Sequence, residues 1–187
     1  MTAALDVGRH PRPWTALEFM NTDFGDIGRL YELEDGCIVM TPAPTRRHQQ
    51  ISRRLVNAIE AWMDQHGSGL RVEGPVNYRL GDDTVFAPDV IVYRADARDD
   101  LYLDPDEVEV LVEVTSANPG RDLVTKMARY AATGVPWYWI IDQQSLTVSI
   151  HELVGGGYRL VQKVDAGIPA RLLGPVPLRL DPATLVR

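Results

Sequence analysis

The sequence contains little cysteine, no long apolar run and no linker-like segment. Cys37 is the single cysteine among 187 residues, which excludes an intramolecular disulfide and a metal site built from several thiolates. No stretch approaches the ~18 consecutive apolar residues that a membrane-spanning helix needs. The first residues, MTAALDVGRHPRPW, lack the apolar core of a secretion signal. We therefore expect a cytoplasmic protein without membrane contact, and any metal must be bound by oxygen or imidazole ligands.

Basic residues are also in short supply. The 19 Lys and Arg residues face 26 Asp and Glu residues, which gives a net charge of −7 and a pI near 5.0. Strong DNA binders are usually basic, so this composition argues against tight binding over the whole surface. Affinity also depends on local patches, and TRRHQQISRR brings Arg46, Arg47 and Arg53 close together. These arginines are either nucleic-acid contacts or part of a solvated helix face.

No internal boundary divides the chain. It has no internal repeat and no Ser-, Gly- or Pro-rich stretch, and 187 residues suffice for one hydrophobic core. Hydrophobic residues make up 45% and charged residues 24%, which is typical of globular proteins and excludes a disordered or fibrous chain. We therefore expect residues 1–187 to form one domain.

The N-terminal third predicts a short helix, a hairpin and a long helix. A capping-box pattern starts at Thr15, and Asp35-Gly36 separates two strand-like runs, which favours a tight hairpin turn. Apolar residues then recur at steps of three and four over Thr45–His66, and Gly67 provides a C-terminal stop. One face of this long helix is therefore expected to be core.

Strand patterns dominate the remainder. RVEGPVNYRL and TVFAPDVIVY read as two strands on either side of a Gly-Asp-Asp turn, and EVEVLVEV follows an acidic loop. Alternation in the last run places Glu109, Leu111 and Glu113 on one face and its valines, Val108 included, on the other. A second helix is expected from about Asn118 or Pro119 to Thr133, and three strands follow it.

Three residues on separate elements form a candidate metal site. Asp89 follows Pro88, which cannot donate to a ladder and so indicates a strand edge or a bulge. Glu113 lies near the end of the next strand, and two adjacent carboxylates repel unless a cation or a shared proton intervenes. Mg²⁺, with Mn²⁺ as a substitute, suits both carboxylates together with the Val114 backbone carbonyl. Lys126, one helix later, would stabilise charge that develops beside the cation.

Each neighbouring residue has a plainer alternative. Lys126 lies four residues after Asp122, which is the spacing of an ordinary surface ion pair on a helix. If Lys126 instead belongs to the metal site, Asp122 would hold the lysine in place. His48 falls on the core side of its helix, which favours a buried histidine bonded to a backbone carbonyl over one that contacts phosphate or water. Glu32 is expected to be solvated on the hairpin, with a place in the acidic cluster as the alternative.

Several segments together resemble a known family. They are PTRRHQQISRRL, YELEDG, FAPDVIVY, and LVEVTS followed by RDLVTKMARYAATGVPWYWIID. They are similar to the Uma-two family of restriction-endonuclease-like proteins, within the PD-(D/E)XK nuclease superfamily. The resemblance runs from about Leu30 to Asp142 and is most specific in GVPWYWIID and the lysine-bearing helix before it.

The resemblance implies an α/β (α+β) fold with a restriction-endonuclease-like core, in which helices flank a central mixed β-sheet and an N-terminal β-hairpin is added. It also implies Mg²⁺-dependent cleavage of nucleic acid, with DNA as the favoured substrate, and an active site at Asp89, Glu113 and Lys126. Thr115 stands where the superfamily motif has lysine. The resemblance accounts for this by taking Lys126 as a lysine that has migrated to the helix.

Three classes of function remain open. The leading one is a metal-dependent endonuclease, for which cleavage of both strands of a duplex favours a homodimer. The second is a non-catalytic nucleic-acid-binding or regulatory module on the same fold, in keeping with the charge of −7 and with Thr115 at the motif position. The third is glycoside hydrolysis by paired carboxylates, which requires no metal and gives Lys126 no role.

Overall fold

The computed structural model describes residues 3–4, 12–24, 30–41, 43–115 and 120–186. Its largest element is a six-stranded sheet with the order β11-β10-β9-β8-β7-β4. The strands are β4 (Leu70–Glu73), β7 (Val90–Arg94), β8 (Val108–Thr115), β9 (Trp137–Asp142), β10 (Thr147–Val154) and β11 (Gly157–Val164). β8 and β9 run parallel, whereas the other neighbours are antiparallel. The expected mixed sheet is therefore confirmed.

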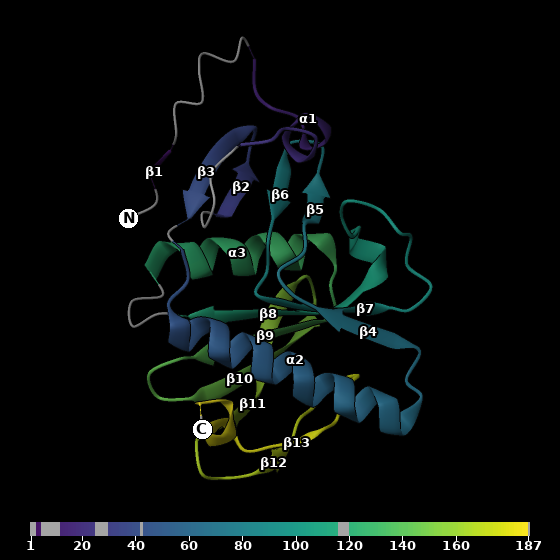
Figure 1. The fold of residues 1–187 in the computed structure, drawn as a ribbon, viewed down its shortest axis with the longest axis vertical. Coiled ribbons are helices and arrows are strands. Elements are labelled where there is room, and N and C mark those ends of the chain that lie inside the picture. Colours follow the sequence, from purple (N-terminus) through teal and green to yellow (C-terminus); the bar gives the residue numbers. More distant parts are fainter. Residues whose placement is uncertain (1–2, 5–11, 25–29, 42, 116–119, 187) are drawn as a thin grey trace.

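One long helix covers each face of this sheet, as Figure 1 shows with α2 (Arg46–His66) on one side and α3 (Gly120–Thr133) on the other. The Thr45 hydroxyl caps α2 by accepting from the His48 N–H, and Gly67 ends it with a φ of 58°. These boundaries confirm the predicted helix. The predicted start of α3 at Asn118 or Pro119 lies outside the described residues, and its end at Thr133 agrees.

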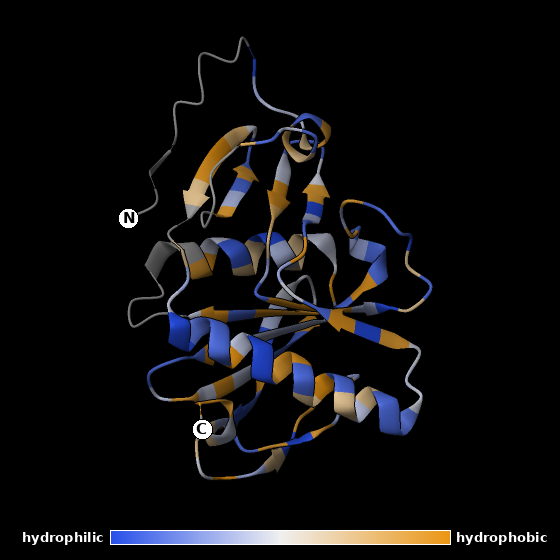
Figure 2. Cartoon of the chain, in the orientation of Figure 1, coloured by the Kyte–Doolittle hydropathy of each residue, from blue (hydrophilic) through white to orange (hydrophobic). Residues whose placement is uncertain are grey.

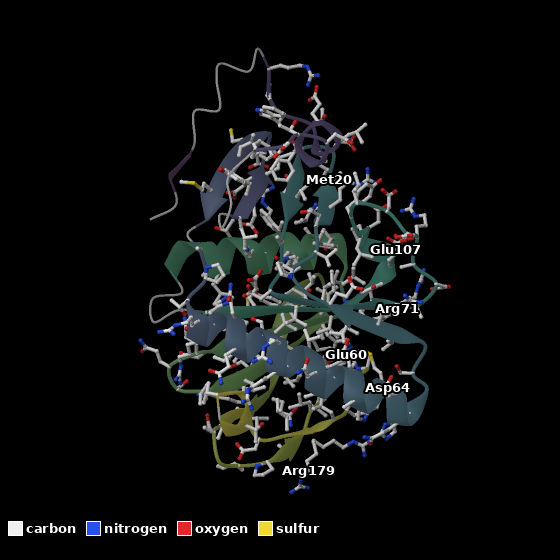
Figure 3. The ribbon with its side chains drawn as sticks, viewed as in Figure 1. Met20, Glu60, Asp64, Arg71, Glu107 and Arg179 are labelled. Carbon is white, nitrogen blue, oxygen red and sulfur yellow. The ribbon has the colours of Figure 1, made fainter. Side chains whose placement is uncertain are left out.

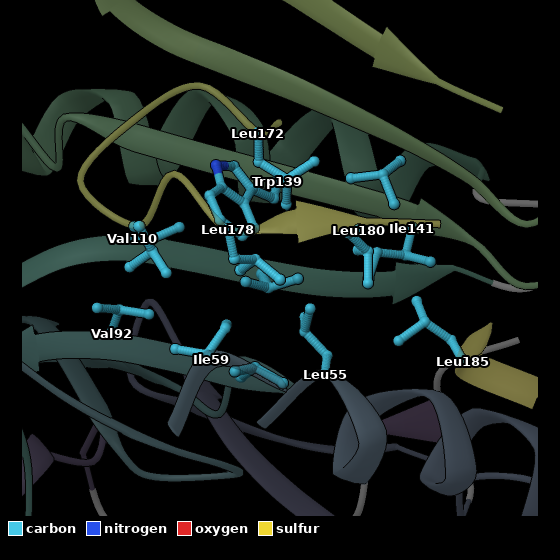
Figure 4. Close-up of a cluster of buried hydrophobic side chains, with 14 of the residues drawn as sticks. Leu55, Ile59, Val92, Val110, Trp139, Ile141, Leu172, Leu178, Leu180 and Leu185 are labelled. Atoms are coloured by element: carbon cyan, nitrogen blue, oxygen red, sulfur yellow. The ribbon is translucent and has the colours of Figure 1, made fainter. Parts of the chain in front are cut away.

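Alternation along β8 divides the interior into two clusters. Val110, Val112 and Val114 pack into the cluster beneath α2, and Leu111 packs into the cluster beneath α3. Figure 4 shows Leu55 and Ile59 of α2 pointing into the cluster that contains Val92 and Val110.

One detail of the predicted alternation is wrong. The β7–β8 register shifts between Val92 and Tyr93, so Glu109 has no strand partner in β7. This bulge turns the Val108 side chain to the face of Leu111, with which it packs.

A second sheet lies beyond α3 (Figure 1), with the order β1-β3-β2-β6-β5. Its strands are β1 (Ala3–Ala4), β2 (Leu30–Glu34), β3 (Cys37–Thr41), β5 (Tyr78–Gly81) and β6 (Thr84–Phe86). The predicted hairpin is confirmed, because Asp35 and Gly36 turn between β2 and β3 with φ values of 48° and 73°. The predicted capping box at Thr15 is present at α1 (Ala16–Met20), whose Phe19 packs on this sheet.

Two segments expected to be single strands each divide between the two sheets. RVEGPVNYRL forms β4 in the larger sheet and β5 in the smaller one, and TVFAPDVIVY forms β6 in the smaller sheet and β7 in the larger one. A proline without an N–H lies inside each segment, Pro75 in the first and Pro88 in the second. The chain therefore crosses twice between the sheets, and the second crossing carries Asp89.

The C-terminal segment closes the cluster beneath α2. It contains β12 (Ala170–Arg171), β13 (Arg179–Leu180) and the short helix η2 (Pro182–Val186), and another short helix, η1 (Pro105–Glu107), precedes β8. Leu172, Leu178 and Leu185 all join the cluster. Figure 2 shows both hydrophilic and hydrophobic colours along α2, and in Figure 3 the exposed Glu60 and Asp64 lie on this helix. Within the described residues, no helix is long and apolar enough to cross a membrane.

Candidate active site

The crossing from β6 to β7 places the first candidate residue. β6 ends at Phe86 and β7 begins at Val90, so Ala87, Pro88 and Asp89 span the two sheets. The Ala87 N–H donates to Glu32 Oε1 at 3.0 Å, and the Val114 N–H donates to Asp89 Oδ2 at 2.7 Å. Hydrogen bonds to both sheets therefore fix the crossing. The strand edge or bulge expected at Pro88 is in fact a connection between two strands of different sheets.

Gly74, in the connection between β4 and β5, packs against the backbone of Asp89. A Cβ at Gly74 would lie 2.1 Å from the Asp89 carbonyl oxygen and 3.0 Å from the Val90 Cα. Both neighbouring atoms belong to the backbone, so no side-chain rotation relieves such a contact. Glycine is therefore required where this connection presses on the Asp89 backbone.

Strand register brings Glu113 next to Asp89. Val90 of β7 pairs with Val112 of antiparallel β8, so the residue before Val90 and the residue after Val112 lie side by side. The Glu113 side chain is 11% exposed, and its Oε1 accepts from the Tyr130 hydroxyl at 2.8 Å. Asp89 therefore lies just before β7, beside Glu113 of the neighbouring strand β8, and Glu113 is held from the α3 side.

Lys126 links Glu113 to the smaller sheet. Its Nζ lies 3.2 Å from Glu113 Oε1 and 2.9 Å from Glu32 Oε1, and its side chain is only 11% exposed. The ammonium also lies 5.4 Å from the centre of the Phe86 ring. This lysine is thus part of a buried charge cluster. The side chain of Asp122, the proposed partner, lies outside the described part of the chain.

Glu32 occupies a different environment from the one expected. It is buried at 6% exposure, accepts from the Ala87 N–H and pairs with Lys126. The expectation of a solvated hairpin residue is therefore wrong, and its alternative, membership of the acidic cluster, holds. The reason is tertiary, because α3 packs between the two sheets and covers this face of the hairpin (Figure 1).

Burial and crowding perturb the acidity of the cluster. Burial raises the pKa of Glu113 to about 8; the Lys126 charge opposes this effect, and the charges of Asp89 and Glu32 add to it. Burial likewise raises the pKa of Tyr130 well above its ordinary value, and the Glu113 charge adds to that shift. At neutral pH Glu113 therefore keeps its proton unless a further positive charge comes close.

His48 contacts the cluster from the α2 side. Its Nε2 lies 3.0 Å from Asp89 Oδ2. Burial acts to lower the pKa of His48, but the Asp89 hydrogen bond and charge, the Glu113 charge and the Val114 backbone together raise it. The expected bond from His48 to the backbone is therefore present, at Val114, and the structure adds an ionic contact with the Asp89 carboxylate.

The three arginines of the basic segment do not form one patch. Arg46, Arg47 and Arg53 are all exposed on α2. The Arg47 Nε donates to the Gln143 carbonyl at 2.7 Å, in the turn after β9. Arg53 instead lines a hollow beside Asp89. The structure therefore brings one of the three next to the candidate site.

Tyr130 is a site residue that the sequence patterns did not single out. It packs in the apolar cluster beneath α3, yet its hydroxyl reaches Glu113. The available signal was its position four residues after Lys126, which places both side chains on one face of the helix.

The donor atoms suit a hard divalent cation. In the part of the chain that the structure describes, no group of three or more His, Cys, Asp or Glu side chains is arranged to hold a metal ion. A site of two carboxylates completed by a backbone carbonyl and water needs no third such side chain. Hydrogen bonds between described residues engage Asp89 Oδ2 and Glu113 Oε1, which leaves the second oxygen of each carboxylate for another ligand. The donors therefore fit the expected cation.

Two comparisons give matches for this chain. The sequence profile of the Uma2 family, described as "Putative restriction endonuclease", matches residues 22–180. The fold is similar to that of a crystal structure from Anabaena variabilis ATCC 29413, titled as a "putative nuclease belonging to DUF820". That match has a TM-score of 0.69 and 20% sequence identity, and covers 93% of this chain and 98% of the other. The sequence matches no curated protein.

Proposed function

Because the chain belongs to the Uma2 family, we propose that residues 1–187 form one domain that hydrolyses phosphodiester bonds of nucleic acid in a Mg²⁺-dependent reaction. DNA is the first substrate to test. The observation that carries the proposal is the position of the Lys126 ammonium, 3.2 Å from Glu113 Oε1 on the strand that neighbours Asp89. Lysine and two carboxylates at one end of a sheet suit phosphodiester hydrolysis.

Asp89, Glu113 and the Val114 carbonyl are the proposed metal ligands. A bound Mg²⁺, or Mn²⁺ in its place, would polarise the phosphate and lower the pKa of a water molecule. Its positive charge would also offset the crowding of carboxylates that contributes to the raised pKa of Glu113. The crowding of buried carboxyl groups and the hard oxygen donors therefore support a cation at this position.

The remaining residues act on the phosphate or position the ligands. A water oxygen attacks phosphorus and gives up a proton to solvent, the bond from phosphorus to one ester oxygen breaks, and that oxygen takes up a proton from solvent. Lys126 stabilises the negative charge that develops on the phosphate oxygens. Glu32 holds the Lys126 ammonium at 2.9 Å, and the Tyr130 hydroxyl holds Glu113. His48 orients Asp89 from the opposite side.

The test is cleavage of labelled single-stranded and duplex DNA, and of RNA, with Mg²⁺, Mn²⁺ or EDTA. We expect cleavage that EDTA abolishes, and a loss of about 10²–10³-fold in Lys126→Met, which lacks a charge-stabilising group. Asp89→Asn and Glu113→Gln should lose both cleavage and Mg²⁺ binding in calorimetry. Arg129→Met, on the same helix, is the matched control and should cleave normally. Absence of metal-dependent cleavage on every substrate, together with absence of Mg²⁺ and Mn²⁺ binding, would refute the proposal.

A second candidate is a nucleic-acid-binding or regulatory module that does not cleave. The net charge of −7 and Thr115 at the motif position favour it. It requires that Asp89→Ala and Lys126→Ala leave binding unchanged and that no metal supports cleavage. Loss of a cleavage activity in either variant eliminates it.

Quaternary structure is part of the proposal. We propose a homodimer, because two copies related by a two-fold axis present paired sites to the antiparallel strands of a duplex. Sedimentation velocity measures this directly. A monomer at micromolar concentration, with or without DNA, contradicts it.

A further inference from the structure

A hollow of about 650 Å³ opens directly beside the candidate site. One wall is α2, where His48, Ser52 and Val56 form a stripe at four-residue steps with Arg53 next to it. Pro44 and Pro75 contribute to the rest of the lining. Asp89, one of the proposed metal ligands, also lines the hollow. We call this cavity the α2 hollow.

The lining suits a partly apolar group. Val56, Pro44 and Pro75 offer aliphatic surface, and Gln49 and Ser52 offer hydrogen-bonding groups. Small-molecule sites are commonly clefts of about 300–1,000 Å³ with mostly apolar walls and a few polar groups. A nucleotide has this mixed character, with an apolar base face, polar base edges and a phosphate. The α2 hollow therefore has room for one nucleotide and matches its mixed chemistry.

The charges near the hollow favour an unpaired strand over a duplex. Arg53 is the only arginine or lysine among its described lining residues. Arg47 and Arg54 bond instead to the carbonyls of Gln143 and Thr184, at 2.7 Å and 3.1 Å. Duplex DNA presents about one charge per 1.7 Å of helix axis and is usually bound through many cations. A single arginine beside an apolar cavity matches one phosphate and one exposed base.

We propose that the α2 hollow holds one unpaired nucleotide next to the scissile phosphate, so that the substrate is single-stranded or locally unpaired nucleic acid. The inference rests on the proposed function for the neighbouring phosphate site. The base lies against Val56, Pro44 and Pro75, and Arg53 binds the phosphate on its far side. A duplex substrate has to open at this position, at the unstacking cost that base-flipping enzymes meet.

Binding without cleavage tests the proposal. Fluorescence anisotropy in EDTA compares fluorescein-labelled single-stranded DNA of about 12 nucleotides, the RNA of the same sequence, the matching duplex, and a free mononucleotide as competitor. We expect at least one single strand to bind about tenfold more tightly than the duplex, because unstacking a paired base costs the duplex a few kcal/mol. Free mononucleotide should compete only weakly, because it lacks the neighbouring phosphates.

Two variants locate the binding in the hollow. Ser52→Phe fills the cavity and should weaken single-strand binding about tenfold, while Asn57→Phe, on the exposed side of the same helix, should not. Arg53→Ala should lower the slope of log affinity against log salt by about 0.7 for a single strand, because one phosphate contact is lost. Arg53 is exposed, so this variant is expected to fold even if Ser52→Phe does not.

The outcomes separate this inference from the proposed function. Single-strand binding that depends on Ser52 and Arg53, without cleavage in the presence of any metal, supports nucleotide binding in the α2 hollow and refutes the proposed nuclease activity. Metal-dependent cleavage with equal or tighter duplex binding, or with binding that neither variant affects, supports the proposed nuclease activity and refutes nucleotide binding in the α2 hollow. Tight binding of free mononucleotide alone also overturns this inference.

Discussion

Substitution of Lys126 by methionine tests the buried charge cluster most directly. Methionine retains an unbranched apolar side chain but removes the ammonium that lies between Glu32 and Glu113. Glu32 is then left buried, at 7% side-chain exposure, with its pairing reduced, whereas Glu113, whose pKa burial raises to about 8, is protonated at neutral pH. Removing one partner of a buried ion pair costs about 3–5 kcal/mol, since the remaining charge is uncompensated. We expect that loss in the free energy of unfolding.

The assay is urea unfolding in EDTA, with thermal unfolding as a second measure. A loss of about 3–5 kcal/mol lowers the melting temperature by roughly 6–20 °C in a chain of this size. Arg129→Met is the control on the same helix, because its pair with Asp35 has side chains 36% and 60% exposed, and such surface pairs contribute about 0–1 kcal/mol. Adding Glu32→Gln to Lys126→Met should recover part of the loss, since glutamine still accepts from the Ala87 N–H. Equal losses in Lys126→Met and Arg129→Met, with unchanged denaturant slopes, would refute the reasoning.

Three further substitutions test how the site is supported. Gly74→Ala places a Cβ 2.1 Å from the Asp89 carbonyl oxygen, so we expect a loss of about 1–3 kcal/mol by urea unfolding and a weaker metal affinity by calorimetry. Leu55→Ala removes a fully buried side chain of α2 and should cost about 2–5 kcal/mol in the same unfolding assay. Tyr130→Phe deletes the hydroxyl that donates to Glu113, which should cost about 1–3 kcal/mol and reduce cleavage more than it alters substrate binding.

Each of these variants has a matched control. Gly81→Ala introduces a Cβ that meets no atom within 4 Å among the neighbours of the described chain, so a loss equal to that of Gly74→Ala contradicts the steric account. Asn57→Ala changes an exposed position of α2, and a loss equal to that of Leu55→Ala would contradict the assignment of the core face. Tyr158→Phe removes a hydroxyl bonded to the Val135 carbonyl, away from the site, and should leave cleavage unchanged.

Sequence patterns predicted those helices and turns whose formation depends on interactions between residues close together in the chain. The hairpin at Asp35-Gly36 and the span of α2 follow from turn geometry, capping and apolar spacing, all of which operate within a few residues. The division of TVFAPDVIVY between two sheets did not follow from the pattern. A run of apolar residues bounded by turns reads as one strand, and only its pairing partners decide which sheet each half joins.

The sequence by itself determined which residues can take part in the candidate site: two carboxylates on successive strands, a lysine one helix later and the family they resemble. Tertiary structure alone decided how those residues meet. Lys126 reaches Glu113 because α3 packs between the sheets, and the same packing buries Glu32. Sequence spacing fixes the face of an element on which a side chain lies, whereas burial and ion pairing depend on which elements pack against that face.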